Sequence, residues 1–478
     1  MTTRRMSTPE PTPAAPRQAN WPLRMAVVLV LVVALLLLTA WAVRRAAPDD
    51  ELARVIAAWQ APPPAPGANA FEHLWLIEWD LPEAQRAAVF ADDRERTIEQ
   101  ANATAAAPAG SVPAPEYVSS AEGRFPRWAL EDQPQLQCVR AEDACLSGLS
   151  EIEPEAWQRL EQAGGLRERI EAVHGFGHLR ADDALHFASF ASAATQRSHT
   201  TRIALAIAAR TFREQSPVQG LSLACREVAT ARRFAGHSAH LIARMIKSSL
   251  LRASLRLVGE LLAEYPLQAP LPTECALLAQ PPEPEVGSMC AVAGAENRWM
   301  RHALLLAVEQ GSADVWSADL GDPSSPLFDV GLSVQWHARA LAWSCDQGVL
   351  EQVRSDDPAA IARVSQWPAD PPVLQCIVNP VGCTLARVAQ PDYSRYVARG
   401  MDDLAVLRMG QLLIQLREAQ ARGEDSDVAL ARLARPILNQ RRWKLTKSGT
   451  LELEMYEVSR QATIAWPVPG SRVAAAND

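Results

Sequence analysis

Runs of apolar residues divide the chain into one long apolar segment and a series of amphipathic stretches. Residues 25–43, MAVVLVLVVALLLLTAWAV, contain no charged side chain and a single hydroxyl group, that of Thr39. A helix of this length extends about 28 Å, close to the roughly 30 Å of a bilayer's hydrocarbon core. Trp21 and Trp41 stand near its ends, where indole rings prefer the membrane interface. The pattern predicts one N-terminal transmembrane helix over residues 25–43.

A cleaved signal peptide is the alternative interpretation of this segment, because Ala40-Trp41-Ala42 resembles a cleavage site. The apolar run is longer than signal peptides carry, and Arg44 and Arg45 follow it directly, so we expect an uncleaved anchor. Arginines are more numerous before the run than closely after it, which gives a small positive-inside preference. We therefore expect a single-pass protein of a bacterial inner membrane, with a cytoplasmic N-terminus and the bulk of the chain in the periplasm.

The spacing of apolar residues beyond the anchor predicts a mainly α-helical, irregular extracytoplasmic region. Short helices are expected at 46–60 and 83–100, and no fixed-period repeat connects the later ones. The strongest helical pattern runs from Gln219 to Tyr265 and ends at Pro266. The other helical stretches are 150–218, 297–310, 333–343, 357–366 and 396–441, the last broken near residues 423–425.

The C-terminal region differs in period. Apolar and polar residues alternate from Trp443 to Thr446 and again from Thr450 onward, on either side of Lys447-Ser448-Gly449. This alternation predicts a small β-hairpin.

Low-complexity Ala/Pro segments at 61–69 and 101–115 suggest where the parts of the chain meet. Residues 101–115 either separate two domains or cap one. The expected division is a cytoplasmic tail (1–24), the transmembrane helix (25–43), a juxtamembrane helix with a Pro-rich spacer (44–69), a small helical segment with a linker (70–117), a cysteine-containing helical domain (118–390), and C-terminal helices with the hairpin (391–478).

The eight cysteines all follow the apolar segment. An even number on one side of a membrane favours an oxidising compartment; eight reduced thiols in a cytoplasmic domain are the alternative. Eight cysteines allow 105 connectivities. Two pairs are close in sequence, a third pair encloses the next shortest loop, and the two remaining cysteines form the fourth pair. A zinc site would need a C-x2-C knuckle, which is missing, so no metal is expected. The expected disulfides are Cys138–Cys145, Cys376–Cys383, Cys275–Cys290 and Cys225–Cys345.

Composition and charge restrict the class of protein. Hydrophobic residues make up 48% of the chain and charged residues 21%, as in a folded protein. The formal net charge of −8 argues against nucleic acid as a partner.

One candidate binding surface emerges from the helical pattern. If residues 229–249 form an uninterrupted helix, five basic side chains fall on a narrow stripe of its surface. Such a stripe could bind an anionic lipid, a cell-wall carboxylate or an acidic protein, although a solvated helix face is the simpler interpretation. The stripe consists of Arg233, His237, His240, Arg244 and Lys247.

Other candidate chemistry has a structural interpretation. His174 and His178 have the spacing of metal ligands on a helix, but Gly175 and Gly177 favour a loop. Trp336 and Trp343 could stack on sugars, but core packing is the commoner role of such residues.

Two further motifs are weaker. Lys447-Ser448-Gly449-Thr450 resembles the third motif of penicillin-recognising serine enzymes, but the serine that such enzymes carry three residues before a lysine is missing. The acids Asp314, Asp319 and Asp322 lack the spacing of a calcium loop. No catalytic motif and no cofactor are therefore expected.

Two stretches, WDLPEAQRAAVFADD at 79–93 and LLAEYPLQAPLPTEC at 261–275, resemble uncharacterised proteobacterial single-pass membrane proteins. Such proteins have a short cytoplasmic tail, an anchor and a cysteine-bearing helical periplasmic region. The resemblance implies a location and no activity.

Two classes of function remain open from the sequence. The first is a non-catalytic binding or scaffold module of the cell envelope, whose partner is an envelope protein or a cell-wall component. The alternative is a membrane-tethered periplasmic hydrolase, acting on cell wall or glycan through dispersed Asp, Glu and His residues.

Overall fold

The computed structural model describes residues 21–44, 50–60, 65–106, 118–130, 136, 145–180, 187–236, 240–309, 328–367, 370–388, 392–457 and 462–469. The described part of the chain is mainly α-helical with a small antiparallel sheet near its C-terminal end. Both the fold class and the hairpin were predicted at this level. The helices are α1 (Trp21–Arg44), α2 (Asp50–Gln60), α3 (Phe71–Trp75), α4 (Glu83–Ala106), α5 (Cys145–Gly148), α6 (Pro154–Gln162), α7 (Leu166–Ala172), α8 (Phe187–Arg210), α9 (Pro217–Gly236), α10 (Leu241–Glu264), α11 (Cys290–Glu309), α12 (Val330–Leu341), α13 (Gln347–Arg354), α14 (Ala359–Ser365), α15 (Val373–Val378), α16 (Pro380–Val388), α17 (Ser394–Ala421) and α18 (Ser426–Leu438).

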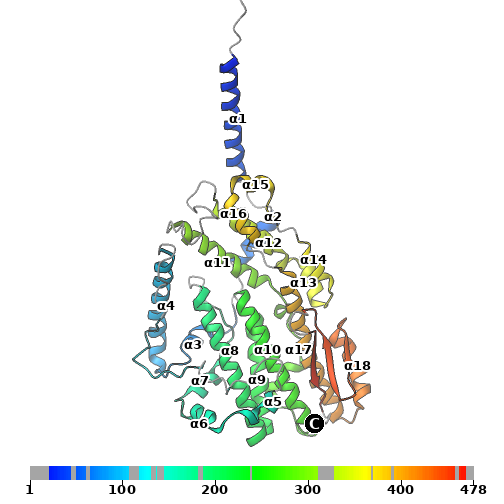
Figure 1. Ribbon diagram of the computed structural model, residues 1–478. Coiled ribbons are helices and arrows are strands. Elements are labelled where there is room, and N and C mark those ends of the chain that lie inside the picture. Colours follow the sequence, from blue (N-terminus) through cyan, green and yellow to red (C-terminus); the bar gives the residue numbers. More distant parts are fainter. Residues whose placement is uncertain are drawn as a thin grey trace, which may run out of the picture.

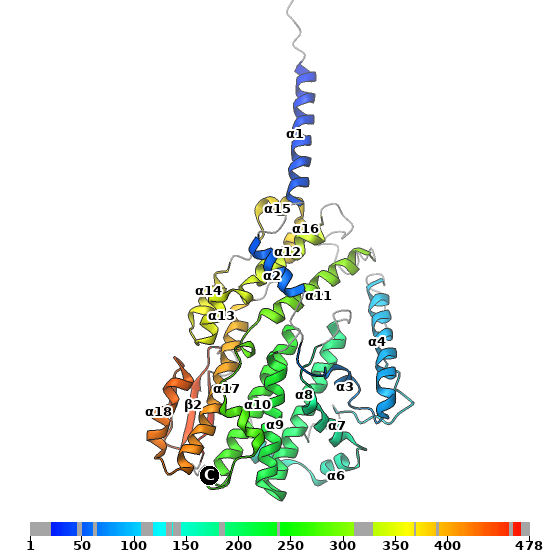
Figure 2. The same ribbon diagram turned by 180° about the vertical axis from the view of Figure 1, so that it is seen from behind.

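Long helices form the centre of the body. Helices α8, α9, α10 and α17 lie side by side, α18 and the sheet flank one side, and α4 lies at the other (Figure 1, Figure 2). The shorter helices α11, α12, α15 and α16 gather at one end, and α1 projects away from that end (Figure 1). Two short helical segments, η5 (Thr273–Ala279) and η7 (Ala342–Cys345), connect the longer ones.

The sheet has three strands rather than the two of the predicted hairpin. The strand order is β1-β2-β3, with antiparallel pairing throughout. In β2 and β3 alternate residues are buried, so one face of the sheet lies on the helices. The third strand is as long as β2, but it ends at a proline, which weakens the strand signal in the sequence. The strands are β1 (Trp443–Leu445), β2 (Thr450–Glu454) and β3 (Thr463–Pro467).

The main hydrophobic core joins segments that are distant in sequence. It contains apolar side chains of α9 and α10, of α17 and of the sheet, and it therefore continues across residue 391, where a boundary was predicted. A second cluster combines α3 with α6, α7 and α8. Leu149 and Leu223 pack against both clusters, so these parts form one continuous interior.

One of two helix breaks was predicted from the sequence. The break between α17 and α18 lies where it was expected, and Asp425 caps α18 by accepting hydrogen bonds from the backbone N–H groups of Asp427 and Val428. The expected uninterrupted helix over residues 229–249 is wrong. Helix α9 ends at Gly236, and α10 begins at Leu241 after a residue with extended backbone, His240.

Helix α1 contains the predicted apolar segment. In the part of the chain that is described, no helix meets both the length and the apolarity required of a membrane span. Helix α2, which was predicted as a juxtamembrane helix, packs against α11 and α12 and buries Leu52 and Trp59.

Candidate functional site

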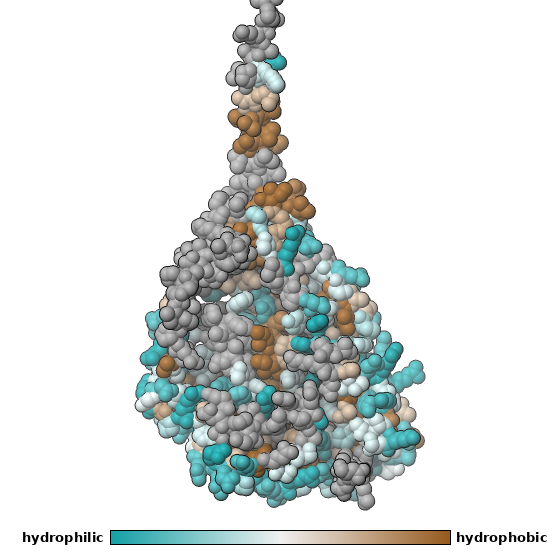
Figure 3. Space-filling model, in the orientation of Figure 1, coloured by the Kyte–Doolittle hydropathy of each residue, from teal (hydrophilic) through white to brown (hydrophobic). Residues whose placement is uncertain are grey.

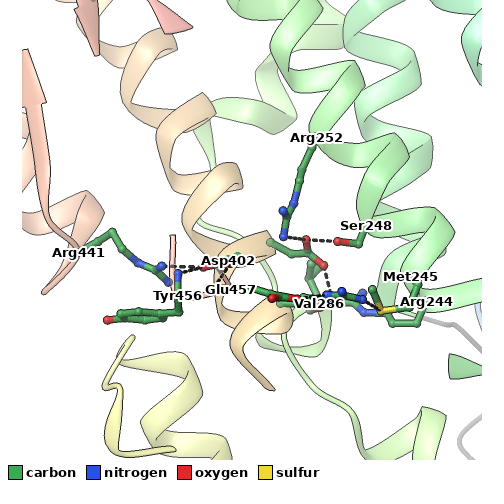
Figure 4. A network of polar contacts seen from close by, with 11 residues as sticks. Arg244, Met245, Ser248, Arg252, Val286, Asp402, Arg441, Tyr456 and Glu457 are labelled. Carbon is green, nitrogen blue, oxygen red and sulfur yellow. Dashed lines mark hydrogen bonds and ion pairs between the residues drawn. The ribbon is translucent and has the colours of Figure 1, made fainter. Parts of the chain in front are cut away.

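Two adjacent acids at the centre of α17 organise the largest group of buried charges. Asp402 and Asp403 are 0% and 1% exposed. Successive residues of a helix point in different directions, about 100° apart, so the two carboxylates reach different neighbours. Asp403 contacts α10. Asp402 points toward Arg441, which precedes β1, and toward Tyr456, which follows β2 (Figure 4).

On the α10 side, Asp403 is held by three donors from one face of that helix. Ser248 Oγ donates at 2.5 Å and Arg244 at 3.1 Å, and Arg252 approaches to 3.4 Å. Arg244 also donates to the carbonyls of Ala235 and Val286. Burial lowers the pKa of Arg244, and the charge of Asp403 opposes this effect. The network thus connects α10, α17 and the end of α9.

On the sheet side, Arg441 connects two acids. Its guanidinium donates to both carboxylate oxygens of Asp356, at 2.9 and 2.6 Å, and to Asp402 at 2.7 Å. Burial lowers the pKa of Arg441, but the hydrogen bonds and charges of Asp356 and Asp402 together outweigh burial and raise it. The guanidinium also lies 3.6 Å from the centre of the Tyr456 ring. Asp402 accepts two further hydrogen bonds, from the backbone N–H groups of Tyr456 and Glu457.

The backbone of Asp356 is unusual. Its φ of 59° lies in the left-handed region, which Asp tolerates better than most residues. This conformation follows α13 and turns the Asp356 carboxylate toward Arg441. Its carbonyl accepts from the Tyr456 hydroxyl at 3.1 Å, so the turn and the sheet are held together from both sides.

Sequence reasoning missed this network. Its signal was the pair Asp402-Asp403 at the start of the apolar run LAVLRMGQLLI, because two acids there must find buried partners. The partners come from α10 and from the residues that precede the sheet, at separations of 155 and 39 residues. Nothing local in the sequence identifies them.

The predicted basic stripe does not exist as a surface, and this expectation is corrected. Arg244 and Lys247 are buried at 3% and 2% exposure because the α10 face that carries them lies against the core. His240 precedes α10 and is also buried, 3.9 Å from Glu296. Arg233 is half-buried on α9 and donates to the carbonyl of His174. His237 lies outside the described residues.

Lys247 has an unusual environment. Its Nζ donates to the carbonyls of Leu179 and Phe234, at 3.2 and 3.1 Å, and lies 6.0 Å from the centre of the Phe234 ring. Burial, and then the charge of Arg244 and of two other arginines, hold the pKa of Lys247 well below its usual range.

A second group of buried charges surrounds Glu227 on α9. Arg197 donates to it at 2.8 Å, and His174 Nε2 lies 3.5 Å away. Burial lowers the pKa of His174, although Glu227 opposes this effect. His178, whose spacing from His174 is that of metal ligands on a helix, faces the carbonyl of Pro66. Within the described ranges, no three His, Cys, Asp or Glu side chains are placed to hold a metal ion.

A surface pocket of about 220 Å³ lies between α6, α7 and the end of α8. Arg210 lies over the Trp157 ring on its wall, 4.6 Å from the ring centre. Two carboxylates, Glu161 and Glu168, also line it, whereas His174 and Glu227 do not.

The tryptophan pair is structural. Trp336 and Trp343 are each 2% exposed, so these rings pack in the interior. The aspartates at 314, 319 and 322 lie outside the described residues.

Three disulfides link described residues, and their pattern corrects two expected pairings. Cys376 pairs with Cys383, as predicted. Cys225 pairs with Cys275, and Cys290 with Cys345, in place of the expected Cys275–Cys290 and Cys225–Cys345. Helix packing explains the change: η5 lies against α9 and η7 lies against α11. Cys145 is also disulfide-bonded, and its expected partner, Cys138, lies outside the described residues.

Comparison with known proteins gives no relative from which a role could be taken. No family model matches the chain, and neither a curated protein nor a solved structure is significantly similar to it.

Proposed function

We propose that this chain is a single-pass inner-membrane protein whose helical body acts in the periplasm as a non-catalytic binding or scaffold module of the cell envelope. Its N-terminus is cytoplasmic, and α1 is its anchor. The partner class is an envelope protein or a cell-wall component.

The pattern of disulfides carries this proposal. The described cysteines are all oxidised, and all of them follow α1 in the sequence. Two of the disulfides join segments 50 and 55 residues apart, and these tie helices of the body together. Stable structural disulfides are typical of secreted and periplasmic proteins and rare in the cytosol.

The exposure of α1 supports its role as an anchor. Its described apolar side chains are not covered by the body: Leu29 and Val30 are 65% and 66% exposed. An uninterrupted apolar helix that projects from the body leaves a surface that only lipid or another apolar partner could cover (Figure 1).

The use of the buried charges supports a binding or scaffold role. Asp402, Asp403 and Asp356 each accept hydrogen bonds from arginine side chains, so their carboxylates hold helices and loops in place. A body braced in this way by ion pairs and disulfides is suited to holding a surface in fixed geometry.

The topology is tested by thiol labelling of intact cells that express the full chain. A membrane-impermeant maleimide is applied before and after reduction, with the outer membrane made permeable, and labelled peptides are mapped by mass. We expect no labelling before reduction, and labelling of Cys225, Cys275, Cys290 and Cys345 after it. Thiols that react without reduction, but only after lysis, would place the body in the cytoplasm and overturn the proposal.

The hydrolase alternative has one observation in its favour, the pocket lined by Glu161 and Glu168. It is tested by incubating the reconstituted full chain with purified cell-wall sacculi and measuring released fragments. We expect no release. Release that Glu161→Gln or Glu168→Gln abolishes would replace the scaffold proposal with a catalytic one.

A further inference from the structure

Helix α15 presents a small apolar surface. Val373, Leu374 and Ile377 are 74%, 63% and 68% exposed. Outside α1, they are the three most exposed large apolar side chains among the described residues. Their spacing of one and four residues places them on one side of the helix. We call these three residues the α15 patch.

The α15 patch is held rigidly rather than left loose. Asn379, directly after α15, is fully buried, and its amide group makes four hydrogen bonds. It donates to the Asp329 carbonyl and to Ser333, and it accepts from the N–H groups of Asp329 and Gly382. These contacts bind the turn between α15 and α16 to the start of α12.

Two further contacts brace α15 from its inner side. Gln375 accepts a hydrogen bond from the buried indole of Trp336, at 2.5 Å. The disulfide between Cys376 and Cys383 fastens α15 to α16. Gln375, Cys376 and Val378 therefore face the body, and the three residues of the α15 patch are directed outward.

The α15 patch lies at the end of the body from which α1 projects. Helix α15 packs against the base of α1, at the end where α1 joins the body (Figure 1, Figure 2). Figure 3 shows an apolar surface at the level of α15, at the end of the body from which α1 projects. A bilayer that surrounds α1 would have its surface at this level.

We propose that the α15 patch inserts into the interfacial layer of the bilayer, on the side from which the body emerges. This inference rests on the proposed function, because it requires α1 to cross the membrane. Amphipathic segments at this level bury their apolar side about 5–10 Å into the boundary between headgroups and acyl chains. Anchor and patch would then contact the membrane at two points and fix the tilt of the body.

The experiment measures the depth of single fluorescent labels in the full chain. Since the described cysteines are all in disulfides, an introduced cysteine can be labelled selectively without reduction. The test position is Val373→Cys, with Leu374→Cys as a second position on the patch. The matched control is Val428→Cys, which replaces a valine that is 61% exposed on α18, at the far end of the body (Figure 1). Leu31→Cys reports on α1.

Each variant is labelled with an environment-sensitive dye and reconstituted into vesicles of phosphatidylethanolamine and phosphatidylglycerol. Nitroxide-labelled lipid and a water-soluble quencher are then compared. Mass mapping first verifies that Cys376–Cys383 is retained. We expect lipid nitroxide to quench both patch labels severalfold more strongly than the Val428→Cys label, and the aqueous quencher to act in the opposite order.

The outcomes separate the two proposals. If the Leu31→Cys label is quenched by lipid but the patch labels behave like the control, insertion of α15 is wrong and the anchor stands. If the Leu31→Cys label is not quenched by lipid either, the anchor itself fails. If the patch labels are shielded from both quenchers, the patch is covered by protein, such as a second copy of the chain, and the insertion proposal is overturned.

Discussion

Asp402 and Asp403 show how adjacent identical residues acquire different roles. Both are buried, but one serves the contact between α17 and α10, and the other fixes the segments around the sheet. Removing one partner of a buried ion pair leaves the other charge without compensation, which costs about 3–5 kcal/mol.

We therefore expect Asp403→Asn to lower the free energy of unfolding by about 3–5 kcal/mol, since Arg244 keeps its charge but loses its carboxylate. Urea denaturation in detergent measures the effect. The control is Asp427→Asn, which changes an exposed acid on α18 and should cost less than about 0.5 kcal/mol. Equal effects of the two substitutions would contradict a structural role for the Asp403 network.

His337 on α12 should make stability depend on pH. Burial lowers the pKa of His337 to about 4, and its Nδ1 accepts a hydrogen bond from Asn297 at 3.3 Å, which requires the neutral ring. Below the ordinary pKa of about 6.5 the unfolded chain binds a proton that the folded chain does not. Stability should therefore fall as the pH is lowered from about 6.5 to 4, by up to about 3 kcal/mol.

The matched variant is His337→Gln, whose amide oxygen can still accept from Asn297. We expect this variant to lose less stability on acidification than the wild type, as measured by urea denaturation at pH 7 and at pH 4.5. Other buried histidines contribute equally to both proteins, so the difference between the two profiles isolates His337. Parallel profiles would show that its ring does not titrate in this range.

At the scale of elements, the disulfides differ in how much chain they enclose. Cys225–Cys275 joins α9 to η5 across 50 residues, whereas Cys376–Cys383 encloses a separation of 7. In the chain-entropy description, a disulfide stabilises the fold more when it closes a longer loop of the unfolded chain.

We expect the double substitution of Cys225 and Cys275 by Ser to lower the free energy of unfolding by about 4 kcal/mol, and that of Cys376 and Cys383 by about 2 kcal/mol. Denaturation under oxidising conditions compares the two variants. If loss of Cys376–Cys383 lowers the free energy of unfolding more than loss of Cys225–Cys275, loop-closure entropy does not explain how these disulfides stabilise the fold.

The sequence predicted elements where the signal was local. The break between α17 and α18 was predicted from Gly423 and Asp425, which favour a turn and a helix cap. The break after Gly236 was missed because the residues beyond it suit a helix in sequence, and nothing local indicates that α10 buries Arg244 and Lys247.

The contacts that make up the candidate site could not be predicted from the sequence. The partners of Asp402 and Asp403 and two of the disulfides depend on how helices pack, and packing brings together residues that no spacing rule connects. Cysteine spacing therefore favoured the short loop between Cys275 and Cys290, whereas η5 lies against α9.

At the scale of the whole molecule, several contacts hold together the end of the body from which α1 projects. Helix α2 docks on α11 and α12 there, and Trp59 donates to the sulfur of Cys345. The same region contains the Cys290–Cys345 disulfide and, through α12, the turn that carries the α15 patch. If α1 is the anchor, orientation of the body is determined by this end alone.

The docking of Trp59 also has a consequence for how the protein is made. Trp59 and Cys345 are 286 residues apart, so α2 is synthesised long before the helices that cover it. At about 5–20 residues per second, the delay is roughly 15–60 s. During this time the indole and the rest of the α2 apolar face have no final partner. If the body is exported, as we propose, slower translation between residues 60 and 345 should prolong the exposure of this face and lower the yield of folded protein.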